Sequence, residues 1–128
     1  MNSYRVDLRE RDIDVFGHVH YAEYLVFCAQ ARNRWLSAVG IQRPGDHVVA
    51  RVEVDYLASA HLADERVDVL IAAREVGTSS LALEEEVRSP DGRVLVRLRS
   101  VIVRYEPSAR GTVAWTEDER QALDAANI

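Results

Sequence analysis

The pattern of hydrophobic and polar positions changes its period twice along this chain. Residues 3–10 alternate between apolar and polar side chains, which predicts a short strand with one wet face. A polar loop over residues 11–20 follows, and the apolar run from Tyr21 to Val39 predicts a largely buried helix of about five turns. Alternation then returns and predicts four strands, over residues 47–57, 65–76, 79–88 and 93–105.

The predicted helix has a narrow polar stripe, and apolar residues cover most of its remaining surface. The stripe consists of Glu23, Gln30, Asn33, Arg34 and Ser37. Arg32 falls on the apolar side, where an unpaired charge is very costly, so we expect a carboxylate or carbonyl partner for it. Asp12 is the candidate for this partner. Gly40 stands where a left-handed C-terminal cap is expected.

Two local signals organise the second half of the chain. Residues 89–92, Ser-Pro-Asp-Gly, predict a tight hairpin, because proline and glycine favour turn positions. Thr116 with Glu119 three residues later resembles a capping box and predicts a short C-terminal helix. Opposed charges should face one another across the hairpin strands, namely Glu84 and Glu86 against Arg97 and Arg99.

The order of these elements predicts an α+β fold in a single domain over residues 1–128. One long central helix should be wrapped by a curved, antiparallel, five-stranded sheet. A single helix cannot cover the edges of such a sheet, so we expect a second chain to extend it.

Composition narrows the class of protein. A net charge of −5 disfavours a nucleic-acid binder, which normally shows a basic face. No apolar run is long enough to span a membrane, and the N-terminus lacks a signal pattern, so we expect a cytoplasmic protein. Cys28 is the one cysteine; it excludes an internal disulfide, and its place on the apolar side of the helix suits a core residue.

The loop before the helix is the candidate site. Asp14 lies shortly before a helix N-terminus, where backbone amides have no intrahelical partner. A carboxylate that attacks or activates water, beside amides that hold an oxyanion, is a workable site for acyl transfer. The alternative is an aspartate that only caps turn amides. His18 and His20 alternate, but no third metal ligand has suitable spacing, so we expect no metal.

The residues of this loop resemble a known family. Residues 12–25, Asp-Ile-Asp-Val-Phe-Gly-His-Val-His-Tyr-Ala-Glu-Tyr-Leu, are similar to the signature of the 4-hydroxybenzoyl-CoA thioesterase branch of the hotdog superfamily. Ala31-Arg32 in the helix, residues 52–57 and residues 77–80 also match, so the resemblance spans nearly the whole chain. It departs from the family at Ile13, where threonine or cysteine is usual, and at Ala29, where many relatives carry glutamate.

The resemblance implies the hotdog fold and hydrolysis of an acyl- or aroyl-CoA to the free acid and CoA. It assigns Asp14 as nucleophile or general base and the backbone N–H of Tyr21 as the donor to the thioester carbonyl. It also implies a set of substrate-binding residues. Gly17 permits close backbone approach, and Ser79 and Ser80 approach the pantetheine or phosphates of CoA. The acyl end is lined by His18, Val19 and His20. His18 could also protonate the leaving group. Tyr24 joins the binding set, with a place in the core as the alternative.

The resemblance further implies a homodimer or homotetramer with its site at the subunit interface, and no cofactor, because CoA is part of the substrate. Two alternatives remain open. One is a thioesterase acting on acyl chains bound to a carrier protein, although the acidic charge of this chain speaks against docking an acidic carrier. The other is a non-catalytic module that binds acyl-CoA. The acyl group itself cannot be inferred from the sequence.

Overall fold

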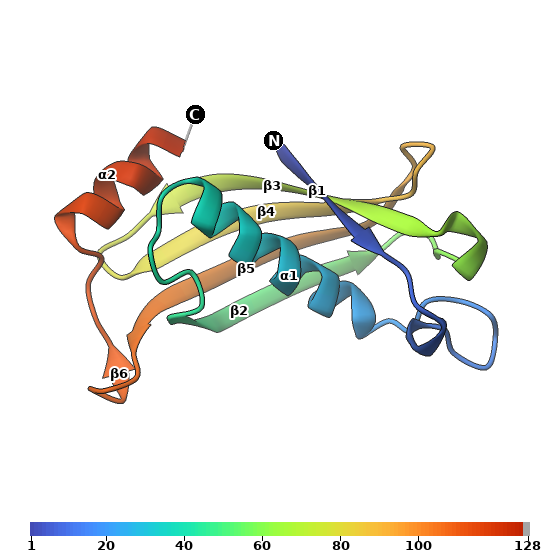
Figure 1. The fold of residues 1–128 in the computed structure, drawn as a ribbon, viewed down its shortest axis with the longest axis horizontal. Helices are drawn as coiled ribbons and strands as arrows, with labels where there is room; N and C mark the ends of the chain where they lie inside the picture. Colours follow the sequence, from blue (N-terminus) through green and yellow to red (C-terminus); the bar gives the residue numbers. More distant parts are fainter. Residues whose placement is uncertain (127–128) are drawn as a thin grey trace.

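Five strands form one curled antiparallel sheet in the order β1-β3-β4-β5-β2 in a computed structural model that describes residues 1–126 (Figure 1). The strands are β1 (Asn2–Asp7), β2 (His47–Tyr56), β3 (Arg66–Val76), β4 (Ser80–Arg88) and β5 (Val94–Glu106). A two-residue strand, β6 (Gly111–Thr112), pairs with β5 and has no counterpart in the sequence prediction. The five predicted strands are confirmed to within three residues at each end.

Two helices accompany the sheet. Helix α1 (Glu23–Ala38) lies across one face of the sheet, and α2 (Glu117–Ala126) lies beyond the end of β3 (Figure 1). Two single-turn 3₁₀ helices, η1 (Glu10–Asp12) and η2 (Leu62–Asp64), interrupt the loops. Within residues 1–126, none of the helices combines the length and the apolar character that crossing a bilayer requires.

The core lies between α1 and the sheet. Alternate residues of β4 face it, and Leu81, Leu83 and Val87 are all buried there. From the helix, Phe27 and Trp35 pack against this layer and are each 1% exposed. Burying a side chain of this size contributes about 1.5–3 kcal/mol, so the contact of α1 with the sheet fixes the position of the helix.

The predicted partner of Arg32 is wrong. Arg32 forms a buried ion pair with Glu85 of β4, with Nε and Nη2 donating to the two carboxylate oxygens at 3.1 and 3.2 Å. Asp12 is buried as well, but it pairs with Arg9, at 2.9 Å, and accepts the Arg9 backbone N–H. The glutamate lies on the inner face of the sheet, directly beneath the helix, whereas Asp12 belongs to the η1 turn.

The predicted hairpin between β4 and β5 is confirmed. Gly92 has φ +87°, a conformation that favours glycine, and its N–H donates to the carbonyl of Ser89. The strand register places Glu84 opposite Arg99 and Glu86 opposite Arg97, as expected. These pairs are 3.9 and 3.6 Å apart on the exposed face, so each contributes only a few tenths of a kcal/mol.

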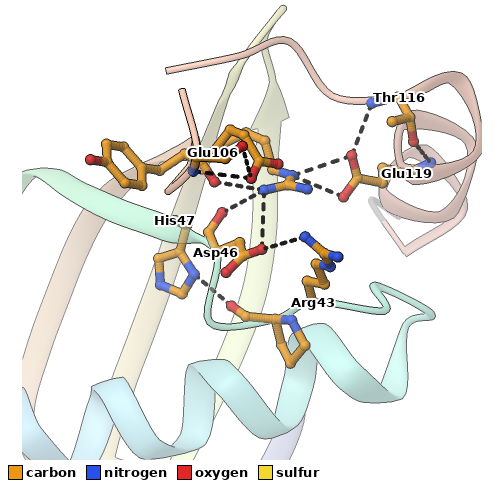
Figure 2. Close-up of polar contacts among 10 residues, drawn as sticks. Arg43, Asp46, His47, Glu106, Thr116 and Glu119 are labelled. Atoms are coloured by element: carbon orange, nitrogen blue, oxygen red, sulfur yellow. Dashed lines mark hydrogen bonds and ion pairs between the residues drawn. The ribbon is translucent and has the colours of Figure 1, made fainter. Parts of the chain in front are cut away.

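A cluster of charges fastens α2 to the sheet (Figure 2). The predicted capping box is confirmed: Thr116 Oγ1 accepts the N–H of Glu119, and a Glu119 carboxylate oxygen accepts the N–H of Thr116. The same carboxylate accepts the Nε–H of Arg104 at 3.1 Å. Arg104 also donates to the backbone carbonyl of Asp46 at 3.0 Å, so one arginine joins β5, α2 and the loop before β2.

The sheet is not covered evenly. Among residues 1–126, strand β2 pairs with β5 alone, and its inward-facing Val49 and Val52 are 47% and 38% exposed. Leu25 and Val26 of α1 are 37% and 41% exposed, so the prediction of burial around most of the helix is wrong at its first turns. The helix packs mainly against β1, β3 and β4 and reaches β2 at Tyr56 through the ring of Tyr24, so most of the inner face of β2 stays open.

Candidate functional site

The loop over residues 12–20 closes on itself before α1 begins. Asp14 N–H donates to the carbonyl of His18 at 2.8 Å, and Gly17 N–H donates to the carbonyl of Asp14 at 3.1 Å. Gly17 has φ +80°, which a residue with a Cβ adopts only with strain. A bridge between Ile13 and Val19 closes the base of the loop, so the position of Asp14 is fixed by backbone bonds on both sides.

The two oxygens of the Asp14 carboxylate differ in their surroundings. Oδ1 accepts the backbone N–H groups of Phe16, at 2.9 Å, and His18, at 3.3 Å. Within residues 1–126, no hydrogen bond reaches Oδ2. The side chain is half-buried, so the loop holds one oxygen and leaves the other for a ligand. Asp14 therefore caps its own turn and still presents a free carboxylate oxygen.

The start of α1 provides a second free group. The structure begins this helix at Glu23 rather than at the predicted Tyr21, because Glu23 N–H donates to the His20 carbonyl and Ala22 N–H donates to His20 Nδ1. A trans peptide is planar, with C=O and N–H pointing in opposite directions. The His20 carbonyl points toward Glu23, so the Tyr21 N–H points away from the helix. No acceptor for this N–H lies within the described residues.

Unpaired amides at a helix start attract negative charge, because the aligned peptide dipoles place a partial positive charge there. The same stretch of chain thus carries a fixed carboxylate and a donor that suits a developing oxyanion. Asp14 and Tyr21 are the two residues to which the resemblance assigns these roles.

The remaining loop residues divide into exposed and buried ones. His18 and His20 are exposed, and the ring of His20 lies 4.6 Å from the ring of Tyr21. Val19 is 4% exposed and donates its N–H to the carbonyl of Ala60. Tyr24 is 2% exposed and packs in the core, where its hydroxyl accepts the Ala60 N–H at 3.0 Å. Burial raises the pKa of the Tyr24 phenol, so the hydroxyl stays neutral.

Ser79 and Ser80 lie at the other end of the sheet. The Ser79 carbonyl accepts the N–H of Arg104, and the Ser80 carbonyl accepts the indole N–H of Trp115, both near α2. The Asp14 loop lies beside the start of β3, and the two serines follow its end (Figure 1). Eleven residues of β3 extend about 33 Å. A single chain therefore does not bring the serines to Asp14.

Two residues near the loop were missed by the sequence analysis. The His61 ring lies 4.7 Å from the His18 ring, edge to face, and its Nδ1 is 3.3 Å from the carbonyl of Gly17. Tyr56, the last residue of β2, donates its hydroxyl to the carbonyl of Tyr21 at 3.0 Å. The alternation of β2 indicates which face Tyr56 occupies, but no local signal connects residues 56 and 61 with a loop about forty residues earlier.

The described part of the chain has no candidate metal site at this loop. Across residues 1–126, no three side chains of His, Cys, Asp or Glu lie close enough together to hold a metal. The imidazoles of His18 and His61 contact one another edge to face instead.

Comparison with known protein families gives one match. The family model of the Thioesterase-like superfamily matches residues 8–123. A search of curated proteins returns no match.

Solved structures with the same fold include the following three. A thioesterase from Thermus thermophilus, complexed with coenzyme A and Zn, is 32% identical; the alignment covers 97% of this chain and 92% of that one, with a TM-score of 0.85. A 1,4-dihydroxy-2-naphthoyl-CoA thioesterase from Synechocystis is 18% identical, with 95% and 94% coverage and a TM-score of 0.82. A Staphylococcus aureus protein in complex with CoA is 16% identical, with 97% and 82% coverage and a TM-score of 0.85.

Proposed function

Since the chain belongs to the thioesterase-like superfamily and is a thioester hydrolase, we propose that it cleaves acyl-CoA at the Asp14 loop. The observation that carries this proposal is the pair of free groups at one loop–helix junction. One is Asp14 Oδ2, held in place through Oδ1, and the other is the Tyr21 N–H, which points away from α1. The CoA bound to the Thermus thermophilus thioesterase supports CoA as the thiol half of the substrate.

The chemistry follows from these two groups. Asp14 Oδ2 either removes a proton from a water molecule, which attacks the carbonyl carbon, or attacks that carbon itself and forms an anhydride that water then cleaves. In both routes the carbonyl oxygen becomes an oxyanion, and the Tyr21 N–H together with the α1 dipole stabilises it. The carbon–sulfur bond then breaks and the CoA thiolate takes up a proton. In the general-base route this step leaves the free acid. In the nucleophilic route it leaves the anhydride with Asp14, which water then cleaves to the free acid and the Asp14 carboxylate.

The acyl group has a candidate place beside the loop. His18 and His20 are exposed in the same loop as Asp14, and we assign the acyl end of the substrate to them. Val19 and Tyr24 lie behind them in the core and support the loop. The specific acyl group that we propose to test at this place is an aromatic one, as in the 4-hydroxybenzoyl-CoA branch of the family.

We further propose that a second copy of the chain completes the site in a hotdog dimer or tetramer, with α1 as the central helix of each copy. The open edge of β2 and its exposed inner face support this assembly. If β2 pairs antiparallel with its copy, the His47 end of one strand lies beside the Tyr56 end of the other. The partner subunit's Ser79 and Ser80 then approach the Asp14 loop, which supports their assignment to the CoA portion.

The test measures CoA release from a panel of acetyl-, octanoyl-, benzoyl- and 4-hydroxybenzoyl-CoA by the wild type and by Asp14→Asn. Asparagine keeps an oxygen that accepts the Phe16 and His18 amides, so the loop is retained while the charge is lost. We expect kcat to fall by about 10²- to 10⁴-fold. Asp7→Asn is the matched control, because that carboxylate is exposed on β1.

Three outcomes decide between the readings. An undiminished rate in Asp14→Asn removes Asp14 from the mechanism. Hydrolysis of the same acyl group on a carrier protein but not on CoA indicates the carrier-dependent enzyme. Binding of acyl-CoA without hydrolysis by the wild type indicates a binding module.

A further inference from the structure

The backbone of Tyr21 is held from one side by a side chain of the edge strand. Tyr56 is the last residue of β2, and its hydroxyl donates to the Tyr21 carbonyl at 3.0 Å. Its ring also meets the Tyr21 ring edge to face, with centroids 6.2 Å apart, and lies 6.0 Å from the ring of the buried Tyr24. The phenol is thus oriented by packing before it reaches the carbonyl.

This contact acts on the peptide next to the proposed oxyanion donor. The Tyr21 N–H belongs to the peptide that joins His20 to Tyr21, and the Tyr21 carbonyl belongs to the following peptide. Two soft dihedral angles separate these planes. The first plane is held because the His20 carbonyl accepts the Glu23 N–H, and the second is held by the Tyr56 hydroxyl and by the bond from Ala22 to His20 Nδ1.

The Tyr56 hydroxyl is available as a donor at neutral pH. Burial is the largest influence on this group and raises the pKa of the phenol above its ordinary value of 10.0, and Tyr21 raises it further. The proton therefore stays on the oxygen and points at the carbonyl. Because Tyr21 lies outside the regular helix, this bond restrains a residue that the helix itself does not hold.

We propose that Tyr56 is a positioning residue for the reaction. Its hydroxyl holds the peptide between Tyr21 and Ala22, and this restrains the Tyr21 backbone so that the Tyr21 N–H meets the oxyanion. The inference rests on the proposed function. An oxyanion exists only in the transition state and the intermediate, so a displaced N–H lowers kcat more than it changes KM. A role in packing alone would depend on the ring of Tyr56 and not on its hydroxyl.

Tyr56→Phe separates these roles, since it removes one oxygen and keeps the ring. With whichever of acetyl-, octanoyl-, benzoyl- and 4-hydroxybenzoyl-CoA the wild type hydrolyses, we expect kcat to fall by about 2- to 10-fold, with KM unchanged and Tm lowered by no more than about 5 °C. Tyr105→Phe is the matched control, because Tyr105 lies near the end of β5, where it pairs with Thr112 of β6. An unchanged kcat in Tyr56→Phe overturns the inference and leaves the proposed function standing.

A measurement without substrate tests the contact itself. In NMR spectra of the ¹³C,¹⁵N-labelled protein, the carbonyl carbon of Tyr21 should shift in Tyr56→Phe and not in Tyr105→Phe, because a carbonyl resonance reports its hydrogen bond. An unmoved Tyr21 resonance overturns the inference as well. If the wild type hydrolyses no acyl-CoA, the proposed function fails and the positioning role fails with it, whatever the resonance does.

Discussion

Replacing Arg32 with methionine should make the stability of this protein depend on pH. The side chains of Arg32 and Glu85 are 4% and 0% exposed, so solvent does little to screen either charge. Methionine fills comparable space without a charge, which leaves the Glu85 carboxylate with the Ser100 hydroxyl at 3.2 Å as a remaining donor. A carboxylate stranded in this way can become neutral by taking up a proton, whereas an arginine cannot lose one.

The size of the effect follows from the pKa of Glu85. Burial is the largest influence and raises this pKa above its ordinary value of 4.5, while the charge of Arg32 lowers it. Without Arg32 the pKa rises further, because the buried carboxylate loses the positive charge that favours its ionised form. When the pKa of a carboxyl is higher in the folded chain than in the unfolded chain, the folded chain binds its proton more tightly. This contribution to stability is complete below the unfolded pKa of about 4.5 and is lost as the pH rises through the folded pKa. The loss is about 1.4 kcal/mol per pH unit, or about 3 kcal/mol at pH 7.

The assay compares the wild type, Arg32→Met and the double variant Arg32→Met/Glu85→Gln by urea and thermal unfolding from pH 5 to pH 8. The double variant is the matched control, because glutamine does not titrate. Arg32→Met should be within about 1 kcal/mol of the control at pH 5 and about 3 kcal/mol less stable at pH 7. For 128 residues this corresponds to a Tm about 11 °C lower. Parallel profiles for the two variants would refute the reasoning, because Glu85 would then not respond to burial.

Two further predictions concern the cap of α2 and the edge strand β2. Thr116→Ala removes the hydroxyl that accepts the Glu119 N–H, so calorimetry should show a free energy of unfolding about 1 kcal/mol lower and a Tm about 4 °C lower. The control, Thr112→Ala, changes an exposed threonine and should leave Tm unchanged. An unmoved Tm in Thr116→Ala would mean that the cap contributes nothing. Val52→Lys places a charge on the open inner face of β2, so light scattering should show a mass of 14.4 kDa in place of a multiple of it, with lower activity. Val48→Lys, on the opposite face of the same strand, should keep the assembly, and a persistent oligomer in Val52→Lys would exclude assembly through this face.

The strands and helices were predictable because their signals are local. A period of two residues defines the faces of β3, β4 and β5, and a glycine with positive φ ends both α1 and the turn between β4 and β5. The capping box of α2 needs only Thr116 and Glu119. The start of α1 was misplaced by two residues, because His20 caps the turn with its ring nitrogen, a use of histidine that has no sequence signature.

Long-range partners were not predictable in the same way. Arg32 was known to need a carboxylate, but 53 residues separate it from Glu85, and the nearer Asp12 is taken by Arg9. The contacts of Tyr56 and His61 with the Asp14 loop depend on how β2 and the following loop pack beside α1. A periodic pattern identifies the face of a strand and leaves open which side chain it meets.

The position of α1 explains why the candidate site and the open edge of the sheet lie together. A helix leaves its amides unpaired only at its first turn. Here the residue just before that turn, Tyr21, is bonded to Tyr56 of the edge strand β2, whose inner face α1 leaves largely uncovered. Leu25 of α1 and Val52 of β2 are exposed apolar side chains on the two elements that meet there. A second copy that pairs with β2 would therefore cover apolar surface and close one side of the Asp14 loop in the same step. On this reasoning, losing the assembly and losing the activity are one event.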